Sequence, residues 1–155
     1  MQHCDDRADR ERPAGNQPDS LKRRKDGRHM VDFTGDSVFN LKKIDEKDIH
    51  KSVYALLITG EEILGGYRIV RDQVVFTTKR IITLDVQGVT GKKQDIFCIP
   101  YAKIQYFSVQ TAGFGEMIPD GKLTLYFMDG NKMAFEFKDN CNILEIARMI
   151  SQYTM

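Results

Sequence analysis

The sequence has little of what most enzymes and secreted proteins depend on. Its 155 residues include three histidines, three cysteines and no tryptophan. The odd number of cysteines and the lack of Cys-x-x-Cys spacing argue against a disulfide framework or a zinc site, and favour a reducing compartment. No apolar run approaches the roughly 20 residues of a membrane-spanning helix. No N-terminal apolar segment of the kind that directs secretion is present. We therefore expect a cytoplasmic protein.

Catalytic patterns are also missing. His50 is the only histidine beyond Met30, and a lone helical histidine is more often a surface residue than a general base. The sequence shows no Ser/His/Asp order and no HExxH helix, and GVTGKK at 88–93 lacks P-loop spacing and lies between two predicted strands. Cys98, predicted to point inward, and Cys141 are expected to be inert thiols. We predict no catalytic residues, no metal and no cofactor, and hence not an enzyme.

The first 30 residues differ from the rest of the chain. All nine Phe and six Tyr lie beyond Met30. The segment KRRKDGR at 22–28 is basic enough to suggest an arm for nucleic acid or anionic lipid. However, residues 1–30 carry six acids against eight bases, which favours a solvated, disordered tail. The overall net charge of +1 names no nucleic-acid partner, and none is expected.

A further interpretation concerns the origin of this tail. Lys-Arg-Arg-Lys can be encoded by a purine run containing AGGAGG, a sequence that recruits bacterial ribosomes, and Met30 follows shortly after. We therefore expect residues 1–29 to be untranslated leader misread as protein, or a cloning remnant. Residues 30–155 are expected to form a single domain, since the chain is long enough for one core but hardly for two.

Two helices are predicted, one at each end of this domain. Ile49, Val53, Leu56 and Leu57 share one helical face, with Asp45 as cap and Gly60 as stop. At the C-terminus, Asn142 and Glu145 form a capping-box pattern. It is followed by an apolar stripe made of Ile143, Ile146, Ala147, Ile150 and Tyr153.

Between the helices, short segments alternate in polarity and are rich in β-branched and aromatic residues, which is typical of strands. Gly65-Gly66 indicates a bulge or a close backbone approach, and Asp129-Gly130 indicates a hairpin. Seven strands are predicted, at 62–70, 72–78, 80–86, 94–100, 104–110, 122–128 and 132–137. This order favours an antiparallel β-sandwich or partly open barrel, capped by the last helix and preceded by an extra one.

Seven strands and a capping helix are the pleckstrin-homology (PH) architecture. RDQVVFTTKRIITLDVQGVTGKK, followed by IPYAKIQYFSVQTAG, resembles a family of small bacterial PH domains formerly described only as a domain of unknown function. LLITGEEI and FEFKDNCNILEIARMIS fit the same family, so that the resemblance runs from about Ile44 to Met155. It implies the fold and self-association into homo-oligomers, including closed rings. It brings no catalytic residues.

Two candidate sites follow. In an up-and-down meander, the turn after 62–70 and the turn after 80–86 lie at the same end. An anionic-lipid or phosphoryl ligand could bind there to basic residues, namely Arg68, Arg71, Lys92 and Lys93. The alternative is that these are solvated turn charges. Lys79-Arg80 belongs to the opposite end and is interpreted as a turn with solvated charges.

The second candidate is an oligomer interface. An open sandwich leaves edge strands with unpaired backbone groups, which a monomer must cover or blunt. The loop AGFGEMIPDG is unusually apolar, and its interface candidates are Phe114, Met117 and Ile118. The alternative is that these side chains fold back onto the sandwich. We therefore predict a homo-oligomeric interaction or scaffold module, with weak binding to anionic lipid as the alternative function.

Overall fold

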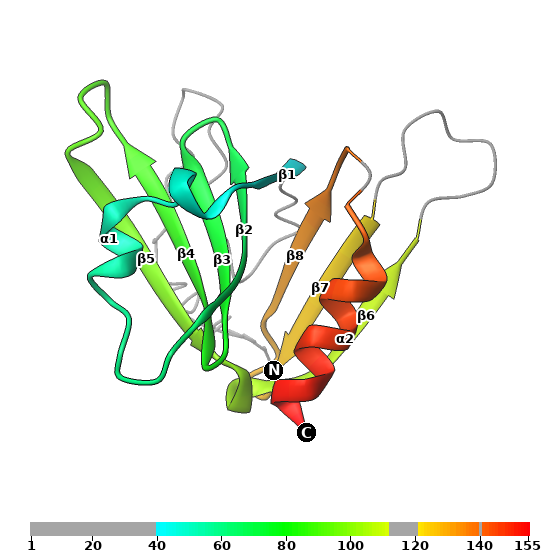
Figure 1. The fold of residues 1–155 in the computed structure, drawn as a ribbon. Helices are drawn as coiled ribbons and strands as arrows, with labels where there is room; N and C mark the ends of the chain where they lie inside the picture. Colours follow the sequence, from blue (N-terminus) through cyan, green and yellow to red (C-terminus); the bar gives the residue numbers. More distant parts are fainter. Residues whose placement is uncertain (1–39, 112–120, 140) are drawn as a thin grey trace, which may run out of the picture.

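The computed structural model describes residues 40–111, 121–139 and 141–155. Over these residues the chain forms strands and short helices in a PH-like arrangement (Figure 1). The strands are β1 (Asn40–Ile44), β2 (Ile63–Ile69), β3 (Asp72–Thr77), β4 (Arg80–Gln87), β5 (Lys93–Pro100), β6 (Ile104–Gln110), β7 (Gly121–Phe127) and β8 (Lys132–Phe137). The helices are the 3-10 turns η1 (Glu46–Asp48) and η2 (Tyr101–Lys103) and the α-helices α1 (Lys51–Tyr54) and α2 (Ile143–Thr154).

The sequence did not predict strand β1, so that the described part has eight strands and not seven. Its sequence, NLKKI, buries only Leu41 and shows no alternation. β1 exists because it pairs on both sides, antiparallel with β2 and parallel with β8. One continuous sheet results, in the order β5-β4-β3-β2-β1-β8-β7-β6.

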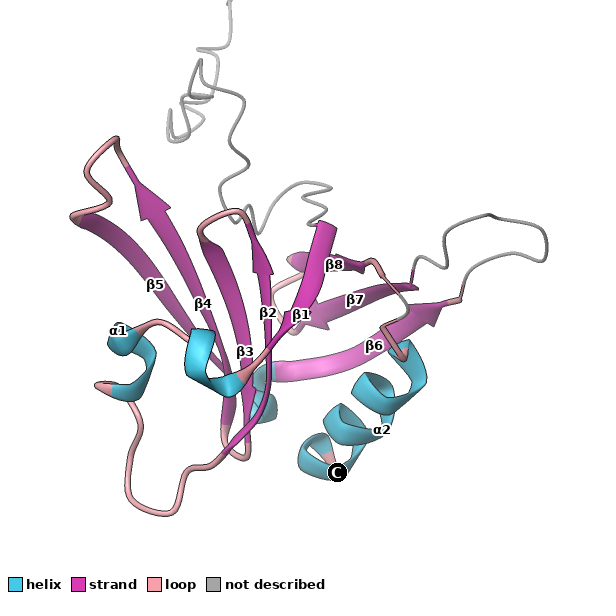
Figure 2. Cartoon of the chain, turned by 45° about the horizontal axis from the view of Figure 1, so that its top comes forward, coloured by secondary structure: helices cyan, strands magenta, loops and turns pink. Residues whose placement is uncertain are grey.

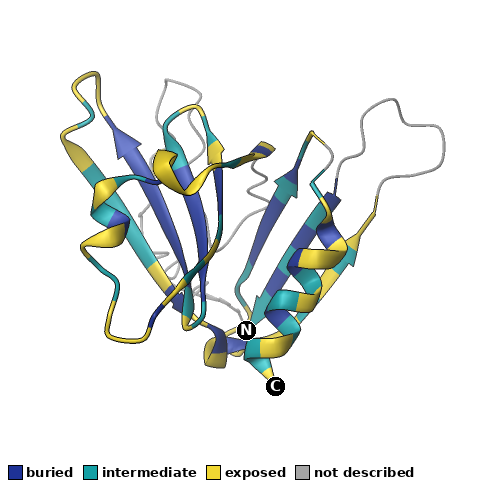
Figure 3. Cartoon of the chain, viewed as in Figure 1, coloured by how far each residue is buried: buried dark blue, intermediate teal, exposed yellow. Residues whose placement is uncertain are grey.

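The sheet folds into two antiparallel meanders, β2–β5 and β6–β8, which face each other at an angle (Figure 1). Strands β5 and β6 end the sheet without pairing with each other, so it is open, as predicted. Figure 3 shows β3 and β4 buried along most of their length, whereas β5 is mostly intermediate or exposed. This gradient is typical of an edge strand.

The main core lies between the meanders. Tyr67 packs edge-on against Phe76 and Phe137, with ring centroids 5.7 and 5.0 Å apart. Helix α2 runs along the β6–β7 side and adds Ile146 and Ile150 to this core (Figure 2). The predicted cap is confirmed, because the Asn142 side chain accepts a hydrogen bond from the Glu145 amide.

The predicted N-terminal helix is much shorter than expected. Asp45 precedes η1 but makes no side-chain cap, and α1 is instead capped by His50, whose Nδ1 accepts from the Ser52 amide. Gln73 on β3 interrupts the helix, because its side chain accepts from the His50 amide and donates to the Asp48 carbonyl. These two backbone groups are therefore hydrogen-bonded to a side chain and not to other groups of a helix. The chain crosses the sheet as two separate turns.

These turns still cover the outer face of the β2–β5 meander, as their apolar pattern requires. Ile49 and Val53 pack with Val75 and Ile82 in a second, smaller core. Gly66 makes this possible, because a Cβ there would lie 3.0 Å from the Ile49 side chain. Of the two predicted alternatives for the glycine pair, the bulge agrees with the shift of the β2–β3 register between Ile63 and Gly65, whereas the atoms close to Gly66 belong to side chains.

The predicted orientation of Cys98 is wrong. Cys98 is exposed, and its neighbour Ile99 is the buried residue that joins the main core. Cys98 stands opposite Ile82, on the face that carries the smaller core. The strand was located correctly, but the phase of its alternation is shifted by one residue, which moves every side chain to the other face.

The β2–β3 turn contains a strained residue. Val70 has a φ of 47°, in the left-handed region that β-branched residues avoid, and its side chain is 87% exposed.

We predict that Val70→Gly stabilises the fold by about 1 kcal/mol, because glycine adopts this conformation without strain and little buried area is lost. Urea unfolding measures the change. A matched Val89→Gly change, at a position that is 97% exposed, should not stabilise. A less stable Val70→Gly protein would contradict the strain argument.

Candidate functional site

The turns β2–β3 and β4–β5 lie at the same end of the meander, as predicted. The side chain of Arg71 crosses between them, and its Nη2 donates a hydrogen bond to the Gly88 carbonyl over 2.9 Å. Lys92 and Lys93, at the start of β5, are exposed. The structure therefore brings Arg71 to the same turn as the two lysines, and commits one of its nitrogens to the backbone.

Arg68 lies one residue before the β2–β3 turn and is exposed on the outer face of β2. It stands opposite Lys42 on β1, whose ammonium forms an ion pair with Asp139 at 2.7 Å. Its position on the strand, and not in the turn, separates it from Arg71. Phe114, Met117 and Ile118 lie outside the described residues, and their role as interface anchors stays a prediction.

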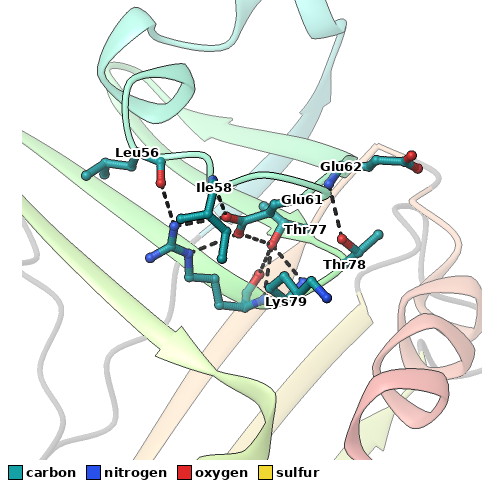
Figure 4. A network of polar contacts seen from close by, with 8 residues as sticks. Leu56, Ile58, Glu61, Glu62, Thr77, Thr78 and Lys79 are labelled. Atoms are coloured by element: carbon teal, nitrogen blue, oxygen red, sulfur yellow. Dashed lines mark hydrogen bonds and ion pairs between the residues drawn. The ribbon is translucent and has the colours of Figure 1, made fainter.

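The corner between β3 and β4 differs from its prediction. Lys79 is exposed, but Arg80 is not a solvated charge: its side chain is 20% exposed and binds the fully buried carboxylate of Glu61 (Figure 4). Arg80 Nε donates to Glu61 Oε1 over 3.0 Å, and Arg80 Nη2 donates to Oε2 over 2.9 Å. The pair is bidentate, the strongest geometry for these groups.

This ion pair fixes the segment that leads from α1 into β2. Arg80 Nη2 also donates to the Leu56 carbonyl over 2.6 Å, and the Ile58 amide donates to Glu61 Oε2 over 3.1 Å. The Thr77 hydroxyl donates to Glu61 Oε1 over 2.7 Å. The segment has few buried apolar groups of its own, so this network holds it against the corner.

The electrostatics of Glu61 follow from these contacts. Burial alone would raise the pKa of its carboxyl, but the hydrogen bonds from Arg80, Thr77 and Ile58, together with the Arg80 charge, hold the pKa below its usual value. The hydrogen bond with Glu61 in turn raises the pKa of Arg80. The pair is thus charged and fully engaged, which suits a structural clamp and leaves neither group available to a substrate.

The sequence missed this clamp because its partners are distant. Glu61 lies 19 residues before Arg80 and is followed by the exposed Glu62. Only the antiparallel pairing of β2 with β3, and of β3 with β4, brings them together. An acid just before one strand and a base at the first position of another have the character of ordinary turn residues until that pairing is known.

The described residues contain a candidate interface at the β5 edge. A groove of about 490 Å³ runs beside β5 and reaches the β7–β8 turn. Its lining is mainly apolar, with Lys103 and Asp129 as the charged members, and consists of Ile96, Phe97, Cys98, Ile99, Pro100, Lys103, Phe127, Met128 and Asp129. Met128 is 77% exposed. An apolar groove beside an open edge strand can take an added strand.

The described ranges also bear on clustered metal ligands, on the histidine and on helix length. No three or more His, Cys, Asp or Glu side chains gather there to hold a metal ion. The ring nitrogen Nδ1 of His50 is used to cap α1. None of the helices formed by the described residues is both long and apolar enough to span a membrane.

Comparison with known families agrees with this fold. The model of the bacterial PH domain family matches residues 32–154. The chain belongs to the bacterial PH domain family. The match covers both meanders, the bridging strand β1 and helix α2, so the whole described fold is the family's domain.

Relatives of this bacterial PH domain occur in Bacillus subtilis (strain 168). YjqA is 31% identical over 116 residues, which cover 75% of this chain and 93% of YjqA. YozO is 33% identical over 103 residues, which cover 66% of this chain and 87% of YozO. Both are named as uncharacterised proteins, so they give the family and no activity.

Solved structures show the same architecture. A DUF1696 family protein with a pleckstrin-homology domain from Shewanella loihica PV-4 is 31% identical, with a TM-score of 0.64 over 75% of this chain and 98% of its own. A pleckstrin-homology domain from Shewanella amazonensis SB2B is 37% identical, with a TM-score of 0.52 over 67% of this chain and 83% of its own. The predicted PH-like fold is therefore confirmed.

The Glu61–Arg80 clamp generates a pH-dependent prediction. We expect Glu61→Gln to destabilise this PH domain by about 2–3 kcal/mol at neutral pH, because Arg80 loses its buried partner. The folded pKa of Glu61 is depressed, so its contribution is full above the unfolded pKa of about 4.3 and is lost as the pH falls through the folded value. The difference between the two proteins should therefore shrink below about pH 4. Urea unfolding at several pH values measures it.

The matched control is Glu62→Gln, which removes the adjacent exposed carboxylate. It should change stability by less than about 0.5 kcal/mol at any pH. Equal effects of the two substitutions, or a Glu61→Gln penalty that persists unchanged in acid, would contradict the charged clamp.

Proposed function

We propose that this bacterial PH domain is a non-enzymatic interaction module that assembles with copies of itself in the cytosol and serves as a scaffold. The observation that supports this most is the open sheet. β5 and β6 are its two terminal strands in the part of the chain that the structure describes, and each has one side without a strand partner. Such edges attract further strands, and a chain with two of them can bind a neighbour at each end.

The two edges make a head-to-tail arrangement natural. In such a contact, the β5 edge of one copy meets the β6 edge of the next, and the same interface repeats around a ring if the rotation closes. The groove beside β5 gives this contact an apolar part, because Met128 and Pro100 line it next to the strand edge. Backbone pairing would then supply direction and the groove would supply buried apolar area.

Met128 provides the sharpest test of this interface. It lies beyond the end of β7 and is largely exposed, so a polar residue there should not disturb the folded chain. We predict that Met128→Asp shifts the protein toward monomer mass, because an unpaired carboxylate in a buried contact is costly. Native mass from light scattering measures the shift, and circular dichroism checks that strand content persists.

The matched control is Leu144→Asp, which places the same charge on an exposed apolar position in the first turn of α2. There an acid is compatible with the helix dipole, and the native mass should stay unchanged. Phe114→Asp separately tests the anchor predicted from sequence. Unmutated protein that is already monomeric at micromolar concentration would overturn the assembly proposal.

The second candidate function is binding of an anionic headgroup or phosphoryl ligand at the end of the sheet that carries the β2–β3 and β4–β5 turns. It is favoured by one observation, the Arg71–Gly88 hydrogen bond that joins the two turns carrying Arg71, Lys92 and Lys93. Three basic groups at one end of a PH fold would attract anionic surfaces at low ionic strength, with roughly 1 kcal/mol per charge. Such attraction is weak at physiological salt.

We predict that this domain binds anionic vesicles at low salt and releases them as salt approaches physiological strength. Simultaneous reversal of Arg71, Lys92 and Lys93 to Glu should abolish the binding in a vesicle co-sedimentation assay. Reversal of Lys47, Lys51 and Lys79, which are exposed elsewhere, should retain most of it. Equal loss in both variants would indicate a general charge effect and remove the turn site.

A further inference from the structure

A polar cluster lies on the inner face of β4 and β5, and it is buried on β4 and partly exposed at Asp95 of β5. Thr83, Asp85 and Gln87 alternate along β4 on the face that carries Ile81 of the main core. They are 1%, 9% and 4% exposed, respectively. Asp95 of β5 stands directly opposite Asp85 in the register. On this face, the start of β4 thus contributes apolar packing through Ile81, and the rest of the strand contributes oxygen atoms.

The two carboxylates of this cluster face each other. Like charges directly opposite on paired strands destabilise a sheet, and burial makes the repulsion stronger. Gln87 lies between them: its Nε2 donates to Asp85 Oδ2 over 3.3 Å and also to Asp95 Oδ2. No ion pair between described residues involves either aspartate. The group that lies between the two carboxylates is therefore the neutral amide nitrogen of Gln87.

Two further oxygen atoms of the cluster have no partner. Gln87 Oε1 and Thr83 Oγ1 are both buried and make no hydrogen bond in the structure. A buried polar atom without a partner destabilises the fold unless something binds it. The amide nitrogen and oxygen of glutamine have nearly the same shape, so a half-turn of the Gln87 amide would exchange them. Oε1 would then face the same point as the two carboxylates.

We propose that Asp85, Gln87 and Asp95 bind a hard divalent cation of the Ca²⁺ or Mg²⁺ class. With the Gln87 amide turned, the cation would lie between its Oε1 and the two carboxylates, neutralise these charges and give Oε1 a partner. Carboxylate and amide oxygens are the ligands that these cations prefer, and waters complete their coordination. The absence of sulfur and imidazole from the cluster makes it unsuited to soft metals. The proposal of a cation site does not rest on the proposed assembly.

The test uses the full chain, freed of metal with EDTA and then titrated with Ca²⁺, Mg²⁺ or Mn²⁺ by calorimetry. We expect one ion per chain and a higher melting temperature with the ion bound. Asp95→Asn should weaken binding by at least about tenfold and should raise the melting temperature of the metal-free protein, since the facing charges are gone. Glu46→Gln, an exposed acid in η1, is the matched control and should change neither quantity.

Gln87→Glu keeps the test decisive if Asp95→Asn fails to fold. A third carboxylate should tighten binding by about tenfold or more and should lower the melting temperature of the metal-free protein. The proposal is overturned if none of the three ions binds at millimolar concentration, or if Gln87→Glu leaves the affinity unchanged. If a peptide that contains arginine stabilises the protein and the three ions do not, the carboxylates bind a guanidinium. This result would also overturn the cation proposal.

Discussion

The double pairing of β1 is the constraint on which the rest of the structure depends. Five residues with one buried side chain join β2 to β8, and thereby turn two separate meanders into a single sheet. Because the join is made in the middle of the sheet order, the strands β5 and β6 are left at its two ends. The core between the meanders, the open edges and the groove beside β5 all follow from where this join is made.

Buried and half-buried polar side chains determine the path of the chain between β1 and β2, where apolar periodicity does not. Gln73 takes the backbone groups of Asp48 and His50 and thereby divides one expected helix into two turns. The Glu61–Arg80 pair holds the segment after α1 against the β3–β4 corner. In both places, a buried or half-buried polar group is satisfied by a partner far away in sequence. Such groups are costly if left alone, so they fix one arrangement of the chain around them.

The strands and the last helix could be predicted because their signals are local. Alternation located β3 and β4, Asp129-Gly130 located a hairpin, and Asn142 located a helix start. The rest needed tertiary knowledge. NLKKI becomes a strand only through its neighbours, and the phase of β5 at Cys98 is ambiguous because apolar residues occupy both of its faces. Of the candidate site, the meeting of Arg71 with the β4–β5 turn was predictable from topology, whereas the clamp on Arg80 was not.

The inner face of β4 shows how one strand can serve two purposes. Near the β3–β4 corner its inward side chain is Ile81, in the main core, and toward the β4–β5 turn its inward side chains are Thr83, Asp85 and Gln87. Burying such groups gains less than burying leucine or valine would, so packing alone does not explain them. They lie on β4, which pairs with the open-edged strand β5, and the turn between these two strands receives Arg71. The features of this PH domain that packing does not require therefore concentrate on β4, β5 and the turn between them, while β7, β8 and α2 mainly supply the core.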